Sequence, residues 1–304
     1  MSKPKSNNAK TISVALTLCL VCSVLVSAVA VGLKPAQVEN ARLDRNKNIL
    51  VAADMYNAES DTAEDVAERF KDFDVEIIDL NKGTYLDDSA LADAGIPDRN
   101  AYDASQATKN QALSEDLGDN DPAGIGRKPK YAKVYVKKDD AGKPEVVVLP
   151  IQGYGLWGTI YGFLTLESDM NTIKGISFYE HKETPGLGAR IEEPEWRAKW
   201  TGIQSYDENG DVATGVTKAG APKENWVDGI SGATLTSRGV SNMIQFWLGD
   251  QGYKPYLDML RKESGQTVED ADTQANQSTQ SKTSPAQPNT ELAALQPVAN
   301  GKEA

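Results

Sequence analysis

The longest apolar run of the chain lies near the N-terminus, between residues 12 and 33, and it contains no charged residue. As a helix it is about 33 Å long, enough to cross the hydrocarbon core of a bilayer. The pattern predicts a transmembrane helix over 12–33, preceded by a basic N-terminus over 1–11. A cleaved signal peptide is the alternative, because Ala28-Val29-Ala30 is typical of a signal-peptidase site. The uninterrupted run as far as Leu33 is long for a signal peptide and favours a retained anchor.

Residues 34–130 mix charged and apolar positions, and we expect them to form a membrane-proximal α/β region. The pattern over 38–55 predicts that the helix continues beyond the membrane. A second helix is expected from Asp61 to Phe70, because Asp61-Thr62 followed by acidic residues is typical of a helix start. Residues 75–80 are expected to form a strand. The polar stretch 84–127 predicts loops with at most short helices.

From residue 131 onward, short β-rich runs alternate with turn residues. Their close spacing predicts an antiparallel sheet, with strands at 131–137, 145–150, 159–167 and 172–179. Apolar spacing and start signals predict three helices, one beginning at 192–196 and the others at 235–248 and 253–261. The expected fold class is therefore α+β, a single transmembrane helix followed by a domain in which helices flank the sheet. Residues 263–304 lack apolar periodicity, and we expect a disordered low-complexity tail.

Composition narrows the classes of function. The formal net charge is −12, so we expect no nucleic-acid partner. The two cysteines, Cys19 and Cys22, both lie in the apolar run, so the remaining chain has no disulfide framework and no cysteine metal site. A single histidine, His181, excludes a metal centre built from several histidines.

One motif stands directly before the predicted helix 235–248: Asp228-Gly229-Ile230-Ser231-Gly232-Ala233-Thr234. Small residues and hydroxyls let an anion approach the positive end of the helix, with the Thr234 hydroxyl at the junction. The alternative is an ordinary helix N-cap made by a Ser or Thr side chain. A phosphate-binding P-loop is excluded because no Gly-Lys-Ser/Thr follows. The wording Asp-x-x-Ser-Gly-Ala-Thr resembles the motif of flavoproteins in which a flavin transferase attaches FMN through its phosphate to the last Thr. That resemblance implies attachment at Thr234.

Two further segments combine glycine with large apolar residues. Gly153-Tyr154-Gly155-Leu156-Trp157-Gly158-Thr159 places its large side chains between glycines, which suits close approach to a flat ligand. In His181-Lys182-Glu183-Thr184-Pro185-Gly186-Leu187-Gly188-Ala189-Arg190, the Pro-Gly pair predicts a tight turn that presents Leu187. Taken singly, each segment is more simply an ordinary turn.

Taken together, in this order and at these separations, the three segments resemble the family of C subunits of the Na+-translocating NADH:quinone oxidoreductase. The resemblance runs from the N-terminus to about Arg261 and is weak across 84–127. The G subunit of the Rnf electron-transport complex shares the attachment motif and the span, but the Gly-Tyr-Gly-Leu-Trp-Gly and Glu-Thr-Pro-Gly-Leu-Gly segments favour the quinone reductase. An anchored extracytoplasmic binding module without a cofactor is a third alternative.

The resemblance implies an electron-transfer subunit whose FMN-binding domain spans residues 131–262. FMN would be held by a phosphoester to Thr234 after the action of a flavin transferase. The partners would be the other subunits of a complex that oxidises NADH, reduces a quinone such as ubiquinone and exports Na+. The chain alone should not oxidise NADH: Gly153–Gly158 has the Gly-x-Gly-x-x-Gly spacing, but an expected strand follows it and not the helix that a dinucleotide-binding turn opens. The single uncharged span offers no ion path, so Na+ translocation is expected in other subunits.

The implied location is a bacterial inner membrane, with a cytoplasmic N-terminus and a periplasmic flavin domain. No catalytic side chain and no metal ligand is expected. His181 is interpreted as a turn residue or, less simply, as a proton donor to reduced flavin. The expected flavin-site residues, besides Thr234, are Asp228, Ser231, Gly232, Ala233, Gly155, Leu156, Trp157, Thr159, Glu183, Thr184, Gly186, Leu187 and Gly188.

Overall fold

The computed structural model describes residues 8–265 of the 304-residue chain. The expectations for the cytoplasmic N-terminus, 1–11, and for the low-complexity tail, 263–304, therefore lie almost entirely outside the described residues.

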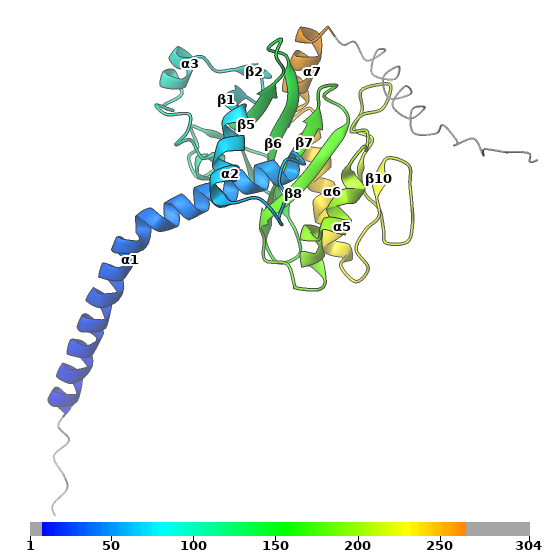
Figure 1. Cartoon of the computed structure of the whole chain (residues 1–304). Coiled ribbons are helices and arrows are strands. Elements are labelled where there is room, and N and C mark those ends of the chain that lie inside the picture. Colours follow the sequence, from blue (N-terminus) through cyan, green and yellow to red (C-terminus); the bar gives the residue numbers. More distant parts are fainter. Residues whose placement is uncertain (1–7, 266–304) are drawn as a thin grey trace, which may run out of the picture.

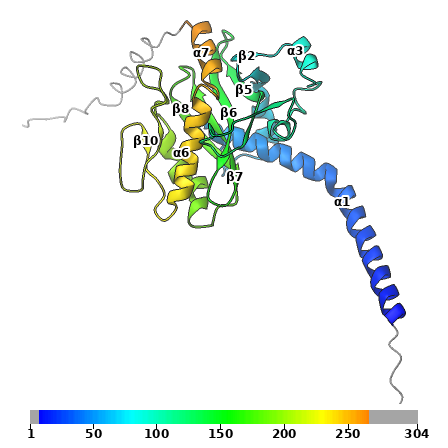
Figure 2. The same cartoon turned by 180° about the vertical axis from the view of Figure 1, so that it is seen from behind.

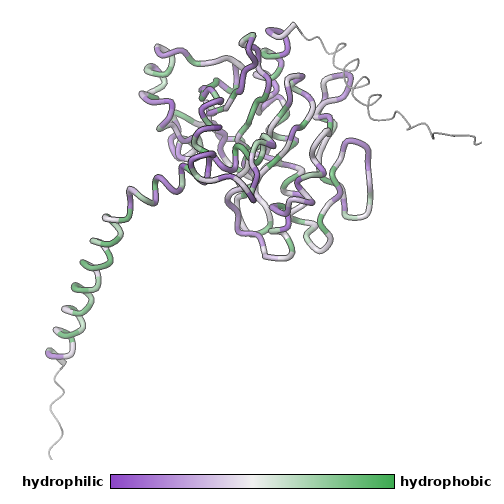
Figure 3. The backbone as a smooth tube through the Cα atoms, in the orientation of Figure 1, coloured by the Kyte–Doolittle hydropathy of each residue, from purple (hydrophilic) through white to green (hydrophobic). Residues whose placement is uncertain are grey.

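The first element, α1 (Asn8–Ala52), is a single long helix that leaves the domain (Figure 1). It is apolar enough to cross a membrane, with a mean hydropathy of 2.7 over its most apolar window, and none of that window is buried in the domain. Figure 3 shows the hydrophobic residues concentrated on the part that extends away. Pro35 lies within the helix, where it removes one main-chain hydrogen bond, and Figure 1 shows α1 bending partway along its length. The predicted apolar segment and its helical continuation thus form one helix, which fits a single-pass membrane anchor.

The last turns of α1 belong to the domain. Ile49, Leu50 and Ala52 are completely buried against one face of the sheet. The Ser177 hydroxyl donates to the Asn48 carbonyl at 2.8 Å, and a Cβ on Gly175 would lie 2.5 Å from the Ala52 carbonyl oxygen. Glycine at position 175 therefore allows the end of the anchor helix to lie directly on the sheet.

The region between the anchor and residue 131 is built from short elements. Helix α2 (Ala63–Arg69) begins with the expected cap, since the Thr62 hydroxyl accepts the Asp65 N–H and the Asp65 carboxylate accepts the Thr62 N–H. It is followed by the 3-10 turn η1 (Phe70–Asp72) and strand β1 (Phe73–Asp79). The polar stretch then holds β2 (Thr84–Tyr85), α3 (Asp88–Asp93), α4 (Ala104–Ala107), β3 (Ser114–Asp116) and β4 (Arg127–Pro129).

Six strands form one antiparallel sheet in the order β2-β1-β5-β6-β7-β8. The four predicted strands are present as β5 (Tyr131–Lys138), β6 (Pro144–Tyr154), β7 (Thr159–Glu167) and β8 (Ile173–Glu180). The sheet is thus antiparallel as expected, and β1 from the membrane-proximal region pairs with β5 along its whole length.

Helices cover both faces of the sheet. The end of α1 and α2 pack on one face, and α6 (Thr234–Leu248) with α7 (Lys254–Glu263) covers the other, as Figure 2 shows. The apolar positions of α6 at helical spacing, Val240, Met243 and Ile244, are fully buried. The α+β class with helices flanking the sheet is confirmed.

The segment between β8 and α6 contains only short elements. They are η2 (Gly188–Glu192), α5 (Pro194–Arg197), η3 (Ala198–Trp200) and a two-stranded parallel pair, β9 (Gly215–Val216) with β10 (Trp226–Val227). The helix expected from residue 192 is therefore a single turn with 3-10 turns on both sides. Trp196 and Trp200 are buried there, and their rings contact edge to face, so packing rather than helix length fixes this segment.

Candidate functional site

The start of α6 carries an exposed hydroxyl that caps nothing. Thr234 is the first residue of the helix and is exposed, Ala233 occupies the N-cap position, and no side chain makes a capping hydrogen bond. The alternative interpretation of this motif as an N-cap made by a Ser or Thr side chain is therefore wrong. The first N–H groups of a helix have no partner within the helix, so the start of α6 can bind the oxygens of an anion.

The motif before Thr234 folds back onto its own helix. The Ile230 N–H donates to the Ser237 hydroxyl at 3.0 Å, and the Ala233 N–H donates to the Ile230 carbonyl at 3.0 Å. Gly232 has φ +80°, a conformation that glycine adopts without strain. These contacts bury Ala233 and leave Ser231 and Thr234 on the surface.

A cavity of about 200 Å³ lies beside Thr234. Two of its lining residues, Lys218 and Arg238, are cationic, and hydroxyls of Thr217, Ser237 and Ser241 also belong to residues of its wall. No acidic residue lines it. Cations and hydrogen-bond donors next to a helix N-terminus suit a phosphate group.

Asp228 organises the wall of this cavity. Its carboxylate accepts the Gly220 N–H at 2.8 Å, and its carbonyl accepts the Trp196 indole N–H at 3.0 Å. A Cβ on Gly229 would lie 2.4 Å from the Thr217 carbonyl oxygen, so the backbone of the motif approaches the loop that carries Lys218 very closely. The first residue of the motif therefore holds a loop in place and does not point at Thr234.

The glycine-rich segment 153–159 is the hairpin that joins β6 to β7. The Gly155 N–H donates to the Gly158 carbonyl at 2.8 Å and closes the turn, and Thr159 begins β7 opposite Tyr154. The side chains in the turn face solvent: Leu156 is 38% exposed and Trp157 is 62% exposed. Large apolar side chains are thus displayed where an isolated domain would ordinarily place polar ones.

The loop after β8 presents a second apolar side chain. The Leu187 N–H donates to the Thr184 carbonyl at 3.1 Å, and Gly186 has φ +73°, which confirms the expected tight turn. Leu187 is 46% exposed. A Cβ on Gly232 would lie 3.3 Å from a Leu187 methyl group, so this loop contacts the turn that precedes Thr234.

Glu183, in the loop after β8, accepts hydrogen bonds from both the hairpin 153–159 and the first turn of α6. Its carboxylate is 5% exposed, accepts the N–H groups of Leu156 and Trp157 at 2.8 and 3.1 Å, and accepts the Thr236 hydroxyl at 2.5 Å. A Cβ on Gly155 or Gly188 would lie 2.4 or 2.6 Å from a Glu183 oxygen, so both glycines are required by the approach of this carboxylate. The position of one carboxylate therefore explains why both loops have glycine at these points.

Two other contacts stiffen the same connection. The Trp157 indole N–H donates to the Thr184 hydroxyl at 3.2 Å. Nδ1 of His181 accepts the Glu183 N–H at 3.1 Å, and its Nε2 lies 2.8 Å from a Glu192 carboxylate oxygen. Nδ1 of His181 is thus engaged by the backbone of its own loop, which favours its interpretation as a turn residue, while Nε2 makes no hydrogen bond within residues 8–265.

The structure thus brings together every segment that the sequence singled out. The motif 228–234, the hairpin 153–159 and the loop 181–190 meet at the start of α6. Sequence reasoning missed Thr236, although its place on the buried stripe with Val240, Met243 and Trp247 gave a signal, because a hydroxyl on a buried stripe needs a partner. It also missed Lys218 and Arg238, which no motif marks, and Leu235, which is 52% exposed beside Thr234.

The residues present fit a ligand with a flat apolar ring and an anionic group. Leu156, Trp157 and Leu187 supply exposed apolar surface, and the cavity beside Thr234 supplies cations and a helix N-terminus. Exposed apolar side chains beside a cationic cavity are compatible with FMN, which has a flat, largely apolar ring and an anionic phosphate.

Comparison with known proteins also indicates a domain that binds FMN. Residues 155–249 match the family described as the FMN-binding domain. The chain is 41% identical over 264 residues to the C subunit of the Na(+)-translocating NADH-quinone reductase of Pseudomonas aeruginosa, covering 85% of this chain and 98% of that protein. It is 40% identical over 266 residues to the corresponding protein of Yersinia pestis, covering 86% and 96%.

Solved structures agree. The crystal structure of Shewanella oneidensis NqrC aligns with a TM-score of 0.64 at 33% identity, covering 73% of this chain and 99% of that one. The crystal structure of the C subunit of the Na(+)-translocating NADH-quinone reductase from Parabacteroides distasonis aligns with a TM-score of 0.57 at 26% identity, covering 74% and 96%.

Proposed function

This chain belongs to the family of C subunits of the Na(+)-translocating NADH-quinone reductase, and from that premise we propose that it carries FMN as a phosphoester on Thr234. Membership of the family makes the chain a flavin electron-transfer subunit of that oxidoreductase complex, with a single-pass anchor in a bacterial membrane. The Rnf-type subunit and the cofactor-free binding module are not favoured by these relatives.

One observation carries the covalent attachment: Thr234 is exposed at the uncapped start of α6, within the same site as Leu187. A hydroxyl that held the helix start would have to give up its hydrogen bond to become an ester, whereas Thr234 has none to give up. The ester oxygens would lie at the positive end of the helix dipole, where one remaining negative charge is favoured. Ser231, Gly232 and Ala233 shape the turn that exposes the hydroxyl.

Bound FMN supplies the redox chemistry, and the protein supplies placement and electrostatics. Leu156 and Leu187 offer apolar surface to the ring, and the Trp157 indole is held beside them by Thr184. Lys218 and Arg238 would neutralise the phosphate. The remaining predicted contacts, Gly155, Thr159, Gly186 and Gly188, act through the backbone, because they set the course of the two loops.

The exposure of the site suits an electron carrier. A substrate-specific enzyme buries most of its ligand, whereas Leu156, Trp157 and Leu187 leave one side of this site open to solvent. A covalent bond prevents the loss of a cofactor that is only partly enclosed. We therefore infer that residues 131–262 form the flavin-carrying unit and that its open side faces the electron donor or acceptor in the complex.

The same proposal includes topology and maturation. The short basic N-terminus is placed in the cytoplasm and the flavin domain in the periplasm, on the opposite side of the inner membrane. A flavin transferase would form the ester at the motif that ends in Thr234. Ubiquinone is the proposed final acceptor of the complex, and Na+ crosses through other subunits.

The test is the variant Thr234→Ala, produced with a flavin transferase in the same cells. We expect a folded chain with no protein-bound flavin after denaturing electrophoresis, and an intact mass equal to that of the bare polypeptide. The matched control is Thr84→Ala, which removes an exposed hydroxyl on β2, outside the flavin site, and should keep the flavin mass. Flavin fluorescence that persists in the denatured Thr234→Ala variant would refute the attachment site.

A further inference from the structure

A second site lies at a gap in the sheet between β5 and β6. Pairing of these strands covers only Tyr135↔Val148 to Lys138↔Pro144, although β6 continues to Tyr154 beside β7. Pro150 lies just beyond the last pair and has no N–H to donate, which is unusual for a strand inside a sheet. The two strands separate at this point.

Side chains from the opposite face occupy the positions that a strand partner would take. The Tyr253 hydroxyl donates to the Pro150 carbonyl at 2.6 Å, and the Trp247 indole N–H donates to the Gln152 carbonyl at 2.7 Å. Two carbonyl groups of β6 are thereby satisfied, while the space on the α1 side stays open.

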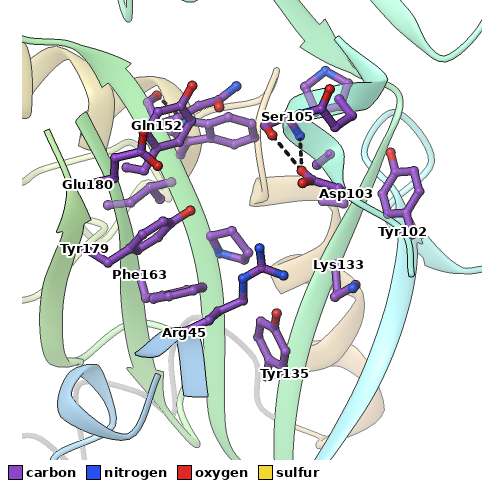
Figure 4. Close-up of a pocket in the computed structure, with 18 of the residues that line it drawn as sticks. Arg45, Tyr102, Asp103, Ser105, Lys133, Tyr135, Gln152, Phe163, Tyr179 and Glu180 are labelled. Atoms are coloured by element: carbon purple, nitrogen blue, oxygen red, sulfur yellow. Dashed lines mark hydrogen bonds between the residues drawn. The ribbon is translucent and has the colours of Figure 1, made fainter. Parts of the chain in front are cut away.

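That space is a cavity of about 370 Å³, within the size range of small-molecule sites. Figure 4 shows it between the separated strands, with Arg45 of α1 reaching into it. Its walls are unusually rich in rings: Tyr102, Tyr135, Tyr161, Phe163, Tyr179 and Trp247. Phe163 stacks on Tyr179 with centroids 5.1 Å apart, and Tyr135 meets Phe163 edge to face at 6.0 Å, so these three rings form one continuous aromatic surface.

Several donors that line this cavity have no hydrogen-bond partner among residues 8–265, and they include the Arg45 guanidinium and the hydroxyls of Tyr135 and Tyr179. Tyr135 is 5% exposed, yet its hydroxyl makes no hydrogen bond, and burial raises its pKa to about 12, so it remains a donor at neutral pH. The Arg45 guanidinium forms neither an ion pair nor a hydrogen bond, and Figure 4 shows both groups turned into the same space. Arg45 is an exposed residue and its guanidinium can meet water, whereas Tyr135 is buried, and a buried donor without an acceptor is costly.

The other charged groups of the cavity are engaged or face its rim. Asp103 accepts the N–H and the hydroxyl of Ser105, and Lys133 donates to the Asn100 carbonyl. Lys109 donates to Gln106, and Glu180 is exposed. Three cations therefore face two carboxylates, and Arg45 is the one of these cations that makes no hydrogen bond within residues 8–265; the hydroxyls of Tyr135 and Tyr179 beside it are also unpaired there.

We propose that this cavity binds a small aromatic carboxylate, with its ring against the aromatic wall and its carboxylate on Arg45 and Tyr135. A guanidinium can hold a carboxylate through two parallel hydrogen bonds, and the Tyr135 hydroxyl supplies a third donor. Because Arg45 belongs to α1 while the rings belong to the domain, the ligand would also fasten the anchor helix to the sheet. The site uses none of the residues assigned to FMN.

The probe is 2-naphthoate, titrated by calorimetry into the full-length chain in detergent micelles. We expect saturable 1:1 binding, at least about tenfold weaker binding of the neutral 2-naphthamide, and no detectable binding of acetate, which lacks the ring. Equal affinity for naphthoate and naphthamide, or the absence of saturable naphthoate binding, would overturn the proposal.

Variants of the cavity residues distinguish naphthoate binding in the cavity from partition of naphthoate into the detergent micelle. Arg45→Gln should weaken naphthoate binding at least about tenfold, Arg45→Lys less, and Tyr135→Phe about three- to tenfold. The controls Arg42→Gln, on the same helix, and Tyr56→Phe, outside the cavity, should bind as the unmodified chain does. An Arg45→Gln variant with the same thermal midpoint and unchanged naphthoate affinity would refute the site. Flavin content of each variant is read separately from visible absorbance, so failure here leaves the flavin proposal untouched.

Discussion

The two sites of this molecule are opposites in how they place polar and apolar groups. At the start of α6, a carboxylate is buried with its hydrogen bonds complete, and Leu156, Trp157 and Leu187 are exposed. In the gap between β5 and β6, aromatic rings are buried, and the guanidinium of Arg45 and the hydroxyl of Tyr135 lack partners among the described residues.

The comparison indicates two different signs of a ligand site: apolar side chains that are exposed, and buried polar groups that have no hydrogen-bond partner. An exposed apolar surface lacks an apolar cover, and a buried donor lacks an acceptor. In the first site the buried polar group already has its partners, because Glu183 accepts hydrogen bonds from Leu156, Trp157 and Thr236. In the second site the protein has unsatisfied donors that a ligand would complete.

The largest expected effect is a loss of stability when the buried carboxylate of the first site is removed. Glu183→Ala leaves the N–H groups of Leu156 and Trp157 and the hydroxyl of Thr236 without an acceptor, so we expect the free energy of unfolding to fall by about 3–5 kcal/mol. Urea unfolding of the full chain, followed by circular dichroism, measures the change. Glu183→Gln keeps one oxygen for the two N–H groups and should cost only about 1 kcal/mol.

The matched control is Glu195→Ala, an exposed acid on the neighbouring turn α5, which should change stability by less than about 0.5 kcal/mol. A Glu183→Ala chain as stable as this control would mean that the three segments are held by packing alone.

A smaller effect is expected where side chains replace a strand partner. Tyr253→Phe keeps the ring and removes the hydroxyl that donates to the Pro150 carbonyl, so we expect a loss of about 1–3 kcal/mol. The same urea titration measures it. Tyr154→Phe, which removes a hydroxyl from a side chain that is 52% exposed, is the control. Equal stability of both variants would indicate that water satisfies β6 in the gap.

The smallest expected effect depends on pH and concerns Lys133. Burial, with a contribution from Arg45, lowers the pKa of Lys133 to about 8. The folded chain therefore binds fewer protons than the unfolded chain between about pH 8 and pH 10.5, and stability contributed by this residue rises with pH in that window. Relative to Lys133→Met, the unmodified chain should gain on the order of 1 kcal/mol of stability between pH 7 and pH 10.

Paired urea titrations at the two pH values measure this gain. In an Arg45→Gln background the gain should be smaller, because one of the two causes of the lowered pKa is removed. If the difference in stability between the unmodified chain and Lys133→Met did not change with pH, the lowered pKa of Lys133 would be contradicted.

Local signals in the sequence determined much of this protein. The uncharged run 12–33 is long enough to cross a bilayer, and closely spaced β-rich runs joined by turns allow little besides an antiparallel sheet. The cap at Thr62 and the turn at Pro185-Gly186 were predicted because each depends on a few adjacent residues. Likewise, the motif ending in Thr234 marked the start of α6, since small residues and hydroxyls before an apolar run are a local pattern.

Only the tertiary structure decided what depends on residues far apart in the chain. Glu183 meets Thr236 across 53 positions, so its role as the tie between three loops, and the reason for Gly155 and Gly188, cannot be read from either segment. The same holds for Arg45 and Tyr135, which share a cavity because β5 and β6 separate at Pro150. A hydrogen bond or a cavity depends on distances of a few ångströms, and only packing of the whole chain sets those distances.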